Sequence, residues 1–171
     1  MKKILILLLF FGLMGCNTIG KNKQISEAFS CPRVFFSSED RVFIDTVEGV
    51  SSIDDITYKA ELNNFAFIDK CLQQNDAAVI PLDILIIAEP MDALKNGDVS
   101  IPIYAELLDA NDQVLETQYF MVSKSIEKNF ETKSFMETDI IDRLYIITKN
   151  LETYQIVIGF MLDDEKRLLL N

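Results

Sequence analysis

Short runs of alternating apolar and polar residues fill most of this 171-residue chain. A period of two places successive side chains on opposite faces of a strand, so each run can cover one face of a sheet. Turn-forming residues separate the runs, and no long helical pattern or internal repeat interrupts them. From Cys31 onward the pattern predicts strands at residues 33–37, 41–46, 56–70, 78–88, 99–107, 114–122 and 153–162.

Two of these runs also indicate a position within a sheet. Residues 78–88 are apolar at both parities, which predicts a central strand with both faces covered. Pro102 has no N–H to donate, so we expect the strand over 99–107 to lie near a sheet edge. That strand and the one over 114–122 should form a hairpin, because Asp109-Ala110-Asn111-Asp112 between them is a turn sequence.

The number and spacing of the strands favour an all-β fold with a helix only at the C-terminal end. We predict an immunoglobulin-like antiparallel β-sandwich, with a small β-barrel as the alternative. The chain has no tryptophan, so it lacks the core marker of antibody domains and the likeness is architectural. Within this fold, a slip of the apolar phase at Asn63-Asn64 predicts a β-bulge, and Asp163 should cap a short helix through Leu170.

Residues 126–137 are rich in charge. Glu127, Glu131 and Glu137 share one parity, so an extended chain would turn all three toward solvent. Such a row is most often a solvated surface, but it is also the candidate protein-binding face of this chain.

The N-terminal residues have the pattern of an export signal. Two lysines precede an almost purely apolar run over residues 4–11, and Leu13-Met14-Gly15-Cys16 follows. The run is shorter than the ~20 residues that span a bilayer, so we interpret residues 1–15 as a signal peptide and not as a transmembrane helix. An uncleaved N-terminal anchor is the alternative.

Leu13-Met14-Gly15-Cys16 resembles the lipobox of bacterial lipoproteins. The resemblance implies that Cys16 becomes the first residue of the mature protein and carries the acyl chains that hold it to a membrane. By the sorting rule of that family, Asn17 implies the periplasmic leaflet of the outer membrane, with the periplasmic side of the inner membrane as the alternative. Residues 16–30 then form the lipidated cysteine and a polar tether, and residues 31–171 form one domain.

Charge limits the partners of the mature protein. Loss of the signal peptide removes two lysines and leaves 14 basic against 27 acidic residues, a net charge of −13. Such a surface repels nucleic acid and anionic lipid headgroups. The chain has no histidine, which removes the commonest general base and the usual zinc and copper ligand. We therefore expect no cofactor and no metal.

Cys31 and Cys71 remain after lipidation, and an even pair in an exported chain predicts a disulfide bond. Two buried free thiols or a redox site are the alternatives. The chain has no C-x-x-C spacing that would support a reactive thiolate.

Several segments together resemble a group of uncharacterised lipoproteins of Gram-negative bacteria. The cysteine pair and the late Tyr-x-x-x-x-Gly-Phe-x-Leu strand are the most specific, while the final residues depart from an aromatic-rich ending. The resemblance covers nearly the whole mature domain and implies a sandwich-like lipoprotein with no assigned activity and no catalytic residues. The segments are Cys31-Pro32-Arg33-Val34, Tyr58, Cys71, Pro102-Ile103-Tyr104-Ala105, Val114-Leu115 and Tyr154-Gln155-Ile156-Val157-Ile158-Gly159-Phe160 with Leu162.

Other candidate sites have simpler interpretations. The Asp109–Asp112 segment lacks the later oxygen ligands of a calcium loop, and the pairs Asp54-Asp55 and Asp163-Asp164 occur where a turn or cap needs them. The aromatic residues can line a hydrophobic cavity or form ordinary core: Phe35, Phe36, Phe65 and Phe67.

Two functions of different classes remain. The first is a non-enzymatic envelope module that is anchored by lipid and binds another envelope protein. The second is a periplasmic carrier that holds a lipid or other apolar molecule. A solid core favours the module, and a continuous apolar pocket favours the carrier. We expect no enzymatic activity.

Overall fold

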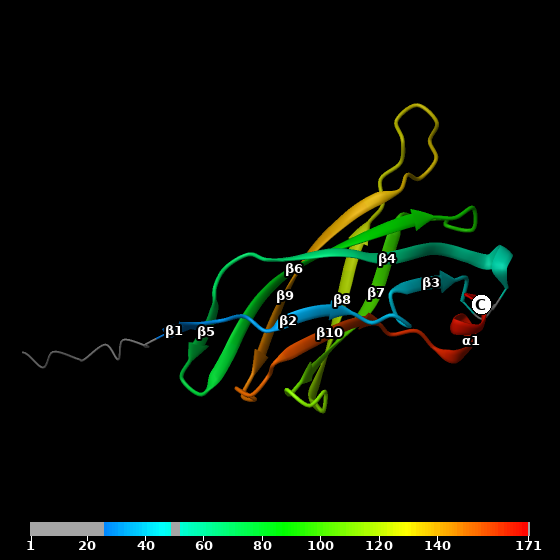
Figure 1. Ribbon diagram of the computed structural model, residues 1–171. Helices are drawn as coiled ribbons and strands as arrows, with labels where there is room; N and C mark the ends of the chain where they lie inside the picture. Colours follow the sequence, from blue (N-terminus) through cyan, green and yellow to red (C-terminus); the bar gives the residue numbers. More distant parts are fainter. Residues whose placement is uncertain (1–25, 49–51, 171) are drawn as a thin grey trace, which may run out of the picture.

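Two packed β-sheets and one short helix make up the protein in a computed structural model, which describes residues 26–48 and 52–170 (Figure 1). The six-stranded sheet consists of β1 (Ser26–Phe29), β3 (Val42–Thr46), β4 (Ile56–Phe67), β5 (Cys71–Gln74), β6 (Ala77–Pro90) and β9 (Thr138–Thr148). The four-stranded sheet consists of β2 (Arg33–Phe36), β7 (Asp98–Leu108), β8 (Val114–Ser125) and β10 (Gln155–Phe160). The C-terminal helix is α1 (Asp164–Leu168).

Strand β6 is the centre of the six-stranded sheet. Strands β5 and β4 pair with different parts of it, and β9 pairs with it over residues 78–88. Its inward side chains are fully buried between the sheets: Ile80, Leu82, Ile84 and Ile86. On its outward parity Pro81 is buried, but the aliphatic side chains of Val79, Leu85 and Ile87 are only half-buried. The predicted central position is confirmed, whereas the predicted cover on both faces is wrong, because the second sheet packs against one face alone.

The four-stranded sheet has the order β2-β10-β7-β8. Strand β2 is parallel to β10, and the other pairs are antiparallel. The predicted hairpin is present as β7 and β8, which pair from Asp98–Ser125 to Leu108–Val114. The described strands form two separate packed sheets, so the β-sandwich is confirmed and the closed-barrel alternative is not.

Strand β7 lies next to the edge strand β8, so it is near a sheet edge, as predicted from Pro102, but it is not itself the edge strand. Pairing with β10 extends only to Ile103 and Phe160. One step further, the carbonyl of Pro102 accepts a hydrogen bond from the Met161 N–H at 3.0 Å. Because proline has no N–H, the only hydrogen bond lost is the one that Pro102 would donate toward Met161 at the end of the β7–β10 ladder. On the other side of β7, Pro102 still pairs with Met121 of β8.

Three strands were not predicted from the sequence: β1, β5 and β9. Strand β1 lies within the segment predicted as tether, and it pairs with β5 from Ser26–Gln74 to Phe29–Cys71. Among the described residues, sheet pairing thus includes Ser26–Phe29, which the sequence had assigned to the tether. The predicted bulge in β4 is confirmed, because the register with β6 shifts between Leu62 and Asn64.

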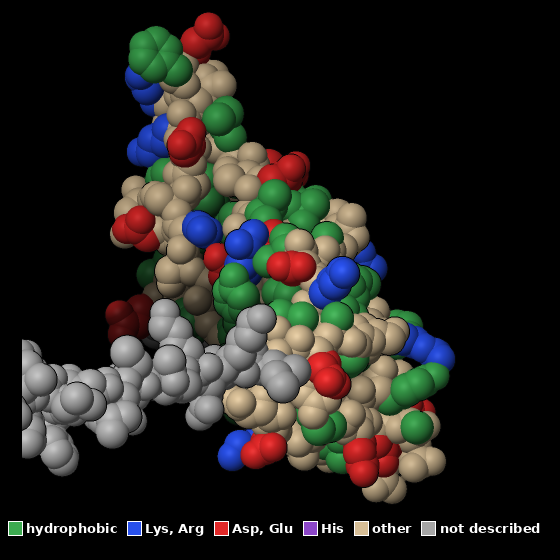
Figure 2. Space-filling view, turned by 90° about the vertical axis from the view of Figure 1, so that its left-hand side faces the viewer, with side chains coloured by type: hydrophobic (Ala, Val, Ile, Leu, Met, Phe, Trp, Pro, Cys, Tyr) green, Lys and Arg blue, Asp and Glu red, His purple; other side chains and the backbone are tan. Residues whose placement is uncertain are grey.

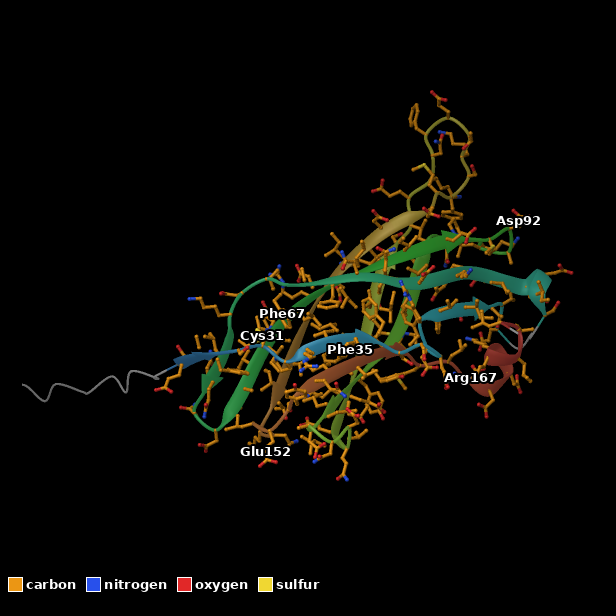
Figure 3. The ribbon with its side chains drawn as sticks, viewed as in Figure 1. Cys31, Phe35, Phe67, Asp92, Glu152 and Arg167 are labelled. Atoms are coloured by element: carbon orange, nitrogen blue, oxygen red, sulfur yellow. A yellow bond between two sulfur atoms is a disulfide. The ribbon has the colours of Figure 1, made fainter. Side chains whose placement is uncertain are left out.

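The C-terminal helix begins as predicted, since the Asp163 side chain accepts a hydrogen bond from the Lys166 N–H at 2.8 Å. Arg167 of this helix pairs with Asp40, whose carboxylate also accepts a 2.7 Å bond from the Tyr104 hydroxyl (Figure 3). Burial raises the pKa of Tyr104 to about 12, so it remains a donor. Gly159 makes room for the tyrosine ring, because a Cβ there would lie 2.5 Å from it.

Cys31 and Cys71 form a disulfide with a Cα–Cα distance of 5.3 Å. Cys31 lies in the segment that crosses from β1 in one sheet to β2 in the other (Figure 3), and Cys71 is the fully buried first residue of β5. The bond therefore fixes the crossing between the sheets.

Replacement of both cysteines by serine should lower the free energy of unfolding by ~4 kcal/mol, because the bond closes a loop of 40 residue positions in the unfolded chain. Thermal melts monitored by circular dichroism measure the loss. A reductant should lower the melting temperature of the natural protein and leave that of the double variant unchanged. Equal melting temperatures for the two proteins under oxidising conditions would contradict the prediction.

Candidate interaction surfaces

The acidic pairs singled out in the sequence have local structural roles. Asp54 and Asp55 lie in a 3-10 helix, η1 (Ile53–Asp55), and Asp163 and Asp164 form the cap and first turn of α1. In residues 26–48 and 52–170, no three metal-ligating side chains are grouped in a way that could hold an ion.

The Asp109–Asp112 segment is the predicted hairpin turn. The Asp109 carboxylate accepts hydrogen bonds from the N–H groups of Gln113 at 3.0 Å and Asn111 at 2.7 Å. These bonds hold the pKa of Asp109 below its usual value. Asp112 has φ of 61°, which completes the reversal of the chain.

The aromatic residues near the sheet edges divide into packed and exposed members. Phe36 packs edge-on against Phe65 at 5.8 Å between ring centroids, and Phe65 packs against Phe67 at 6.3 Å. These three side chains are half-buried against the hydrophobic core, whereas Phe35 is 47% exposed. The aromatic residues predicted to line a cavity or form core therefore belong, apart from Phe35, to the core.

An open groove of about 500 Å³ lies between the ends of the sheets and the C-terminal segment. Phe43, Pro102 and Met121 contribute part of its apolar lining. At its border, Lys166 forms an ion pair with Asp45 at 2.9 Å. The groove is a surface feature, while the space between the sheets is filled by fully buried aliphatic side chains.

Residues 126–137 form a loop that projects from the sandwich between β8 and β9 (Figure 1). A β-bridge between Lys128 and Phe135 joins its two arms, and the Asn129 side chain accepts two backbone N–H bonds at the turn. Phe130 is 86% exposed, and its ring centroid lies 4.4 Å from Lys133 Nζ. Figure 2 shows the loop standing clear of the surface, with a hydrophobic side chain and charges of both signs near its tip.

The three glutamates of the predicted acidic row all lie on this 126–137 loop and are exposed, as expected. They do not form a row along one strand, because the chain reverses between Asn129 and Lys133, whose φ is 60°. Glu127 and Glu137 lie on opposite arms near the base, and Glu131 lies in the turn. Phe130 was not predicted as a contact residue, although a phenylalanine between Asn129 and Glu131 in a charge-rich segment is a visible signal.

A second surface was missed entirely. The outward side chains of β6 and β9, with Leu72 of β5, form an apolar surface on the far side of the six-stranded sheet from the core. We name it the outer apolar face and define it by Leu72, Val79, Leu85, Ile87, Ile141, Tyr145 and Ile147. The three residues of β9 in this set are each more than half exposed. An ion pair between Asp83 and Arg143, at 2.9 Å, crosses its middle.

Glu116 connects the edges of the two sheets where β8 approaches β9. Its carboxylate accepts hydrogen bonds from the buried Thr148 hydroxyl at 2.6 Å and from Asn150 at 3.0 Å, and Gln118 bonds both Glu116 and the Ile147 carbonyl. Partial burial favours the neutral carboxyl, but the hydrogen bonds outweigh it and hold the pKa of Glu116 below its usual value.

Cys16 lies outside the described residues. Within those residues, no helix has the length and apolar character that crossing a membrane requires. Comparison of the chain with protein-family models, curated proteins and solved structures finds no match.

The hydrogen bonds of Glu116 predict a pH-dependent contribution to stability. Folding favours the ionised carboxylate of Glu116, so its pKa is lower in the folded than in the unfolded protein. The stabilisation by Glu116 is therefore complete above its pKa in the unfolded protein and is lost as the pH falls through its pKa in the folded protein. Glu116→Gln should cost about 1 kcal/mol at neutral pH, and its stability should converge with that of the natural protein below about pH 4.5.

Urea unfolding of both proteins across this range measures the difference. Glu152→Gln is the matched control, because this exposed glutamate lies in the neighbouring turn (Figure 3). A constant difference at every pH would show that Glu116 acts by packing alone.

Proposed function

We propose that this protein is a lipid-anchored, non-enzymatic module of the bacterial envelope that binds another envelope protein through the 126–137 loop. The observation that carries the proposal is the exposed Phe130 at the turn of a hydrogen-bonded, projecting loop. Aromatic side chains of this kind are frequent anchors of protein interfaces, where they fill an apolar pocket of the partner.

The loop is ordered before any partner arrives, which supports its role in binding. The bridge between its arms and the bonds to Asn129 restrain the backbone near Phe130. Preorganisation lowers the entropy cost of association, so more of the interaction energy is available for affinity. Exposed charges of both signs accompany this aromatic side chain, with Lys133 over its ring, Glu131 beside it in the turn, and Glu127 and Glu137 near the base of the loop, and they suit a partner with charged residues beside its pocket.

The filled interior supports a module over a carrier. Side chains from both sheets occupy the space between them with no exposure, including Ile84, Ile103 and Ile158. A carrier of an apolar molecule would have to use the open groove beside α1, where the Asp45–Lys166 ion pair interrupts the apolar lining. The outer-membrane position proposed from Asn17 and the lipid anchor at Cys16 rest on the lipobox resemblance.

The anchoring part of the proposal predicts that Cys16→Ser abolishes fatty-acid labelling, because only the thiol of the lipobox cysteine accepts the diacylglycerol. Metabolic labelling in a Gram-negative host measures it, and Cys71→Ser, which leaves the lipobox intact, is the control. Undiminished label on the Cys16 variant would rule out this anchor.

The binding part predicts that Phe130→Ala weakens partner capture by about tenfold or more, as expected for a central aromatic anchor. The acylated protein is used to capture partners from detergent-solubilised envelope, and the captured protein is quantified by mass spectrometry. Phe35→Ala is the matched control, since Phe35 is also an exposed phenylalanine but lies on β2. Both variants should retain the natural melting temperature. Equal capture by the two variants would rule out the loop as the contact.

A further inference from the structure

We propose that the outer apolar face rests on the lipid bilayer that carries the Cys16 anchor, so that the six-stranded sheet lies against the membrane. This inference depends on the anchoring proposed above. It assigns a lipid surface to a part of the molecule that the 126–137 loop does not use.

The outer apolar face is exposed to solvent, most of all along β9. Ile141, Tyr145 and Ile147 of β9 share one parity, so their side chains lie on the same face of the sheet. On β6, Leu85 pairs with Ile141 and Val79 pairs with Ile147 on that face. Exposed apolar side chains that gather in this way on one sheet face, here on either side of the Asp83–Arg143 ion pair, mark a contact with a protein or a membrane.

The position of the anchor is the second argument. Ile147 pairs with Val79, Val79 with Leu72, and Leu72 with Ala28 of β1. This apolar row therefore crosses four strands and ends on the strand that directly follows the tether. Only nine residues, 17–25, separate Cys16 from Ser26 of β1, so the Cα atoms of these two residues are at most ~35 Å apart. The β1 end of the row must therefore lie within about that distance of the bilayer, and the other three strands follow at ~4.8 Å each.

The distribution of charge is the third argument. The end of the face nearest the tether has no charged residue among its paired positions, and Tyr145 there suits the boundary between headgroups and acyl chains. The charge in the middle is a neutral pair of Asp83 with Arg143, whose long side chain can keep its guanidinium among the headgroups. Charged residues become more frequent toward the far end, where Asp139 pairs with Ile87 and Glu89 lies opposite Lys59 of β4.

The net charge of −13 for the mature protein disfavours anionic lipid, so the contact is apolar and should form on a zwitterionic surface. A second copy of this chain is the other candidate for covering an apolar sheet face. The tether favours lipid, because it holds this end of the sheet close to a bilayer whether or not a second copy is present.

The test uses the absence of natural tryptophan, which makes a single introduced tryptophan the only indole in the protein. Tyr145→Trp reports on the outer apolar face. Tyr119→Trp is the matched control, because Tyr119 is 66% exposed against 53% for Tyr145 and faces outward from the opposite sheet. Each full-length acylated variant is reconstituted into phosphatidylcholine vesicles with brominated acyl chains, and quenching is compared with unbrominated vesicles.

We expect the Tyr145→Trp emission to shift to shorter wavelength and to be quenched at least about twofold more than that of Tyr119→Trp, since a face that enters the headgroup region approaches the bromine atoms. Adding Ile147→Asp to the Tyr145→Trp variant should reduce the quenching, while flotation with the vesicles continues through the acyl chains. Melting temperatures confirm that each variant is folded.

Three results would overturn the inference. Equal quenching of the two tryptophans would show that the sheet has no preferred orientation on the bilayer. A blue shift of Tyr145→Trp that depends on the ratio of protein to lipid, without quenching, would assign the face to a second copy. Failure of the protein to float with vesicles would refute the lipid anchor. A protein that floats but whose Tyr145→Trp is not quenched would refute only the contact of the outer apolar face with lipid.

Discussion

The packing of the inward side chains of β6 against the second sheet is the interaction on which the structure depends. Four fully buried aliphatic residues lie along this row, and burial of each stabilises the fold by roughly 1.5–3 kcal/mol. Strand β6 pairs with β4, β5 and β9, so its placement also fixes the register of most of the six-stranded sheet. A slip of one residue would turn the whole buried row toward solvent, which makes this register strongly preferred.

Hydrogen bonds at the borders of the core join elements that the apolar row does not hold together. Tyr58 of β4 donates a 2.8 Å hydrogen bond to the Ser100 carbonyl of β7 and accepts a 3.2 Å bond from the Ser100 N–H. Burial raises the pKa of Tyr58 far above its usual value, so the hydroxyl stays protonated. Glu116 and the contact of Tyr104 with Asp40 occupy other borders. Among the described residues, no buried side-chain nitrogen or oxygen lacks a partner.

The sequence predicts the strands whose apolar residues alternate regularly or form a continuous run, and the turns that have their own chemistry. The β7–β8 hairpin, the bulge near Asn64 and the Asp163 cap are of this kind, because short-range chemistry specifies them. Strand β9 was missed because Asp142 interrupts its inward parity and Asp139 and Arg143 interrupt its outward parity, so neither a regular alternation nor a continuous apolar run is visible. The position of Pro102 depends on where β10 ends, which is a long-range property that no local pattern contains.

The two proposed contacts lie toward opposite ends of the same long strands, and this separation gives each its own role (Figure 1). Near the tether, β5 pairs with β6 at Val79. The 126–137 loop leads into β9 at Thr138, which pairs with Ala88 of β6. At ~3.4 Å per residue, about 30 Å of strand lies between these points. The row of the outer apolar face next to the tether is therefore far from the base of the loop, although the face itself extends along β6 to Ile87 beside that base. An acylated protein held in this way can present Phe130 to a partner in the same membrane plane, because the contact that orients it and the contact that binds use different residues.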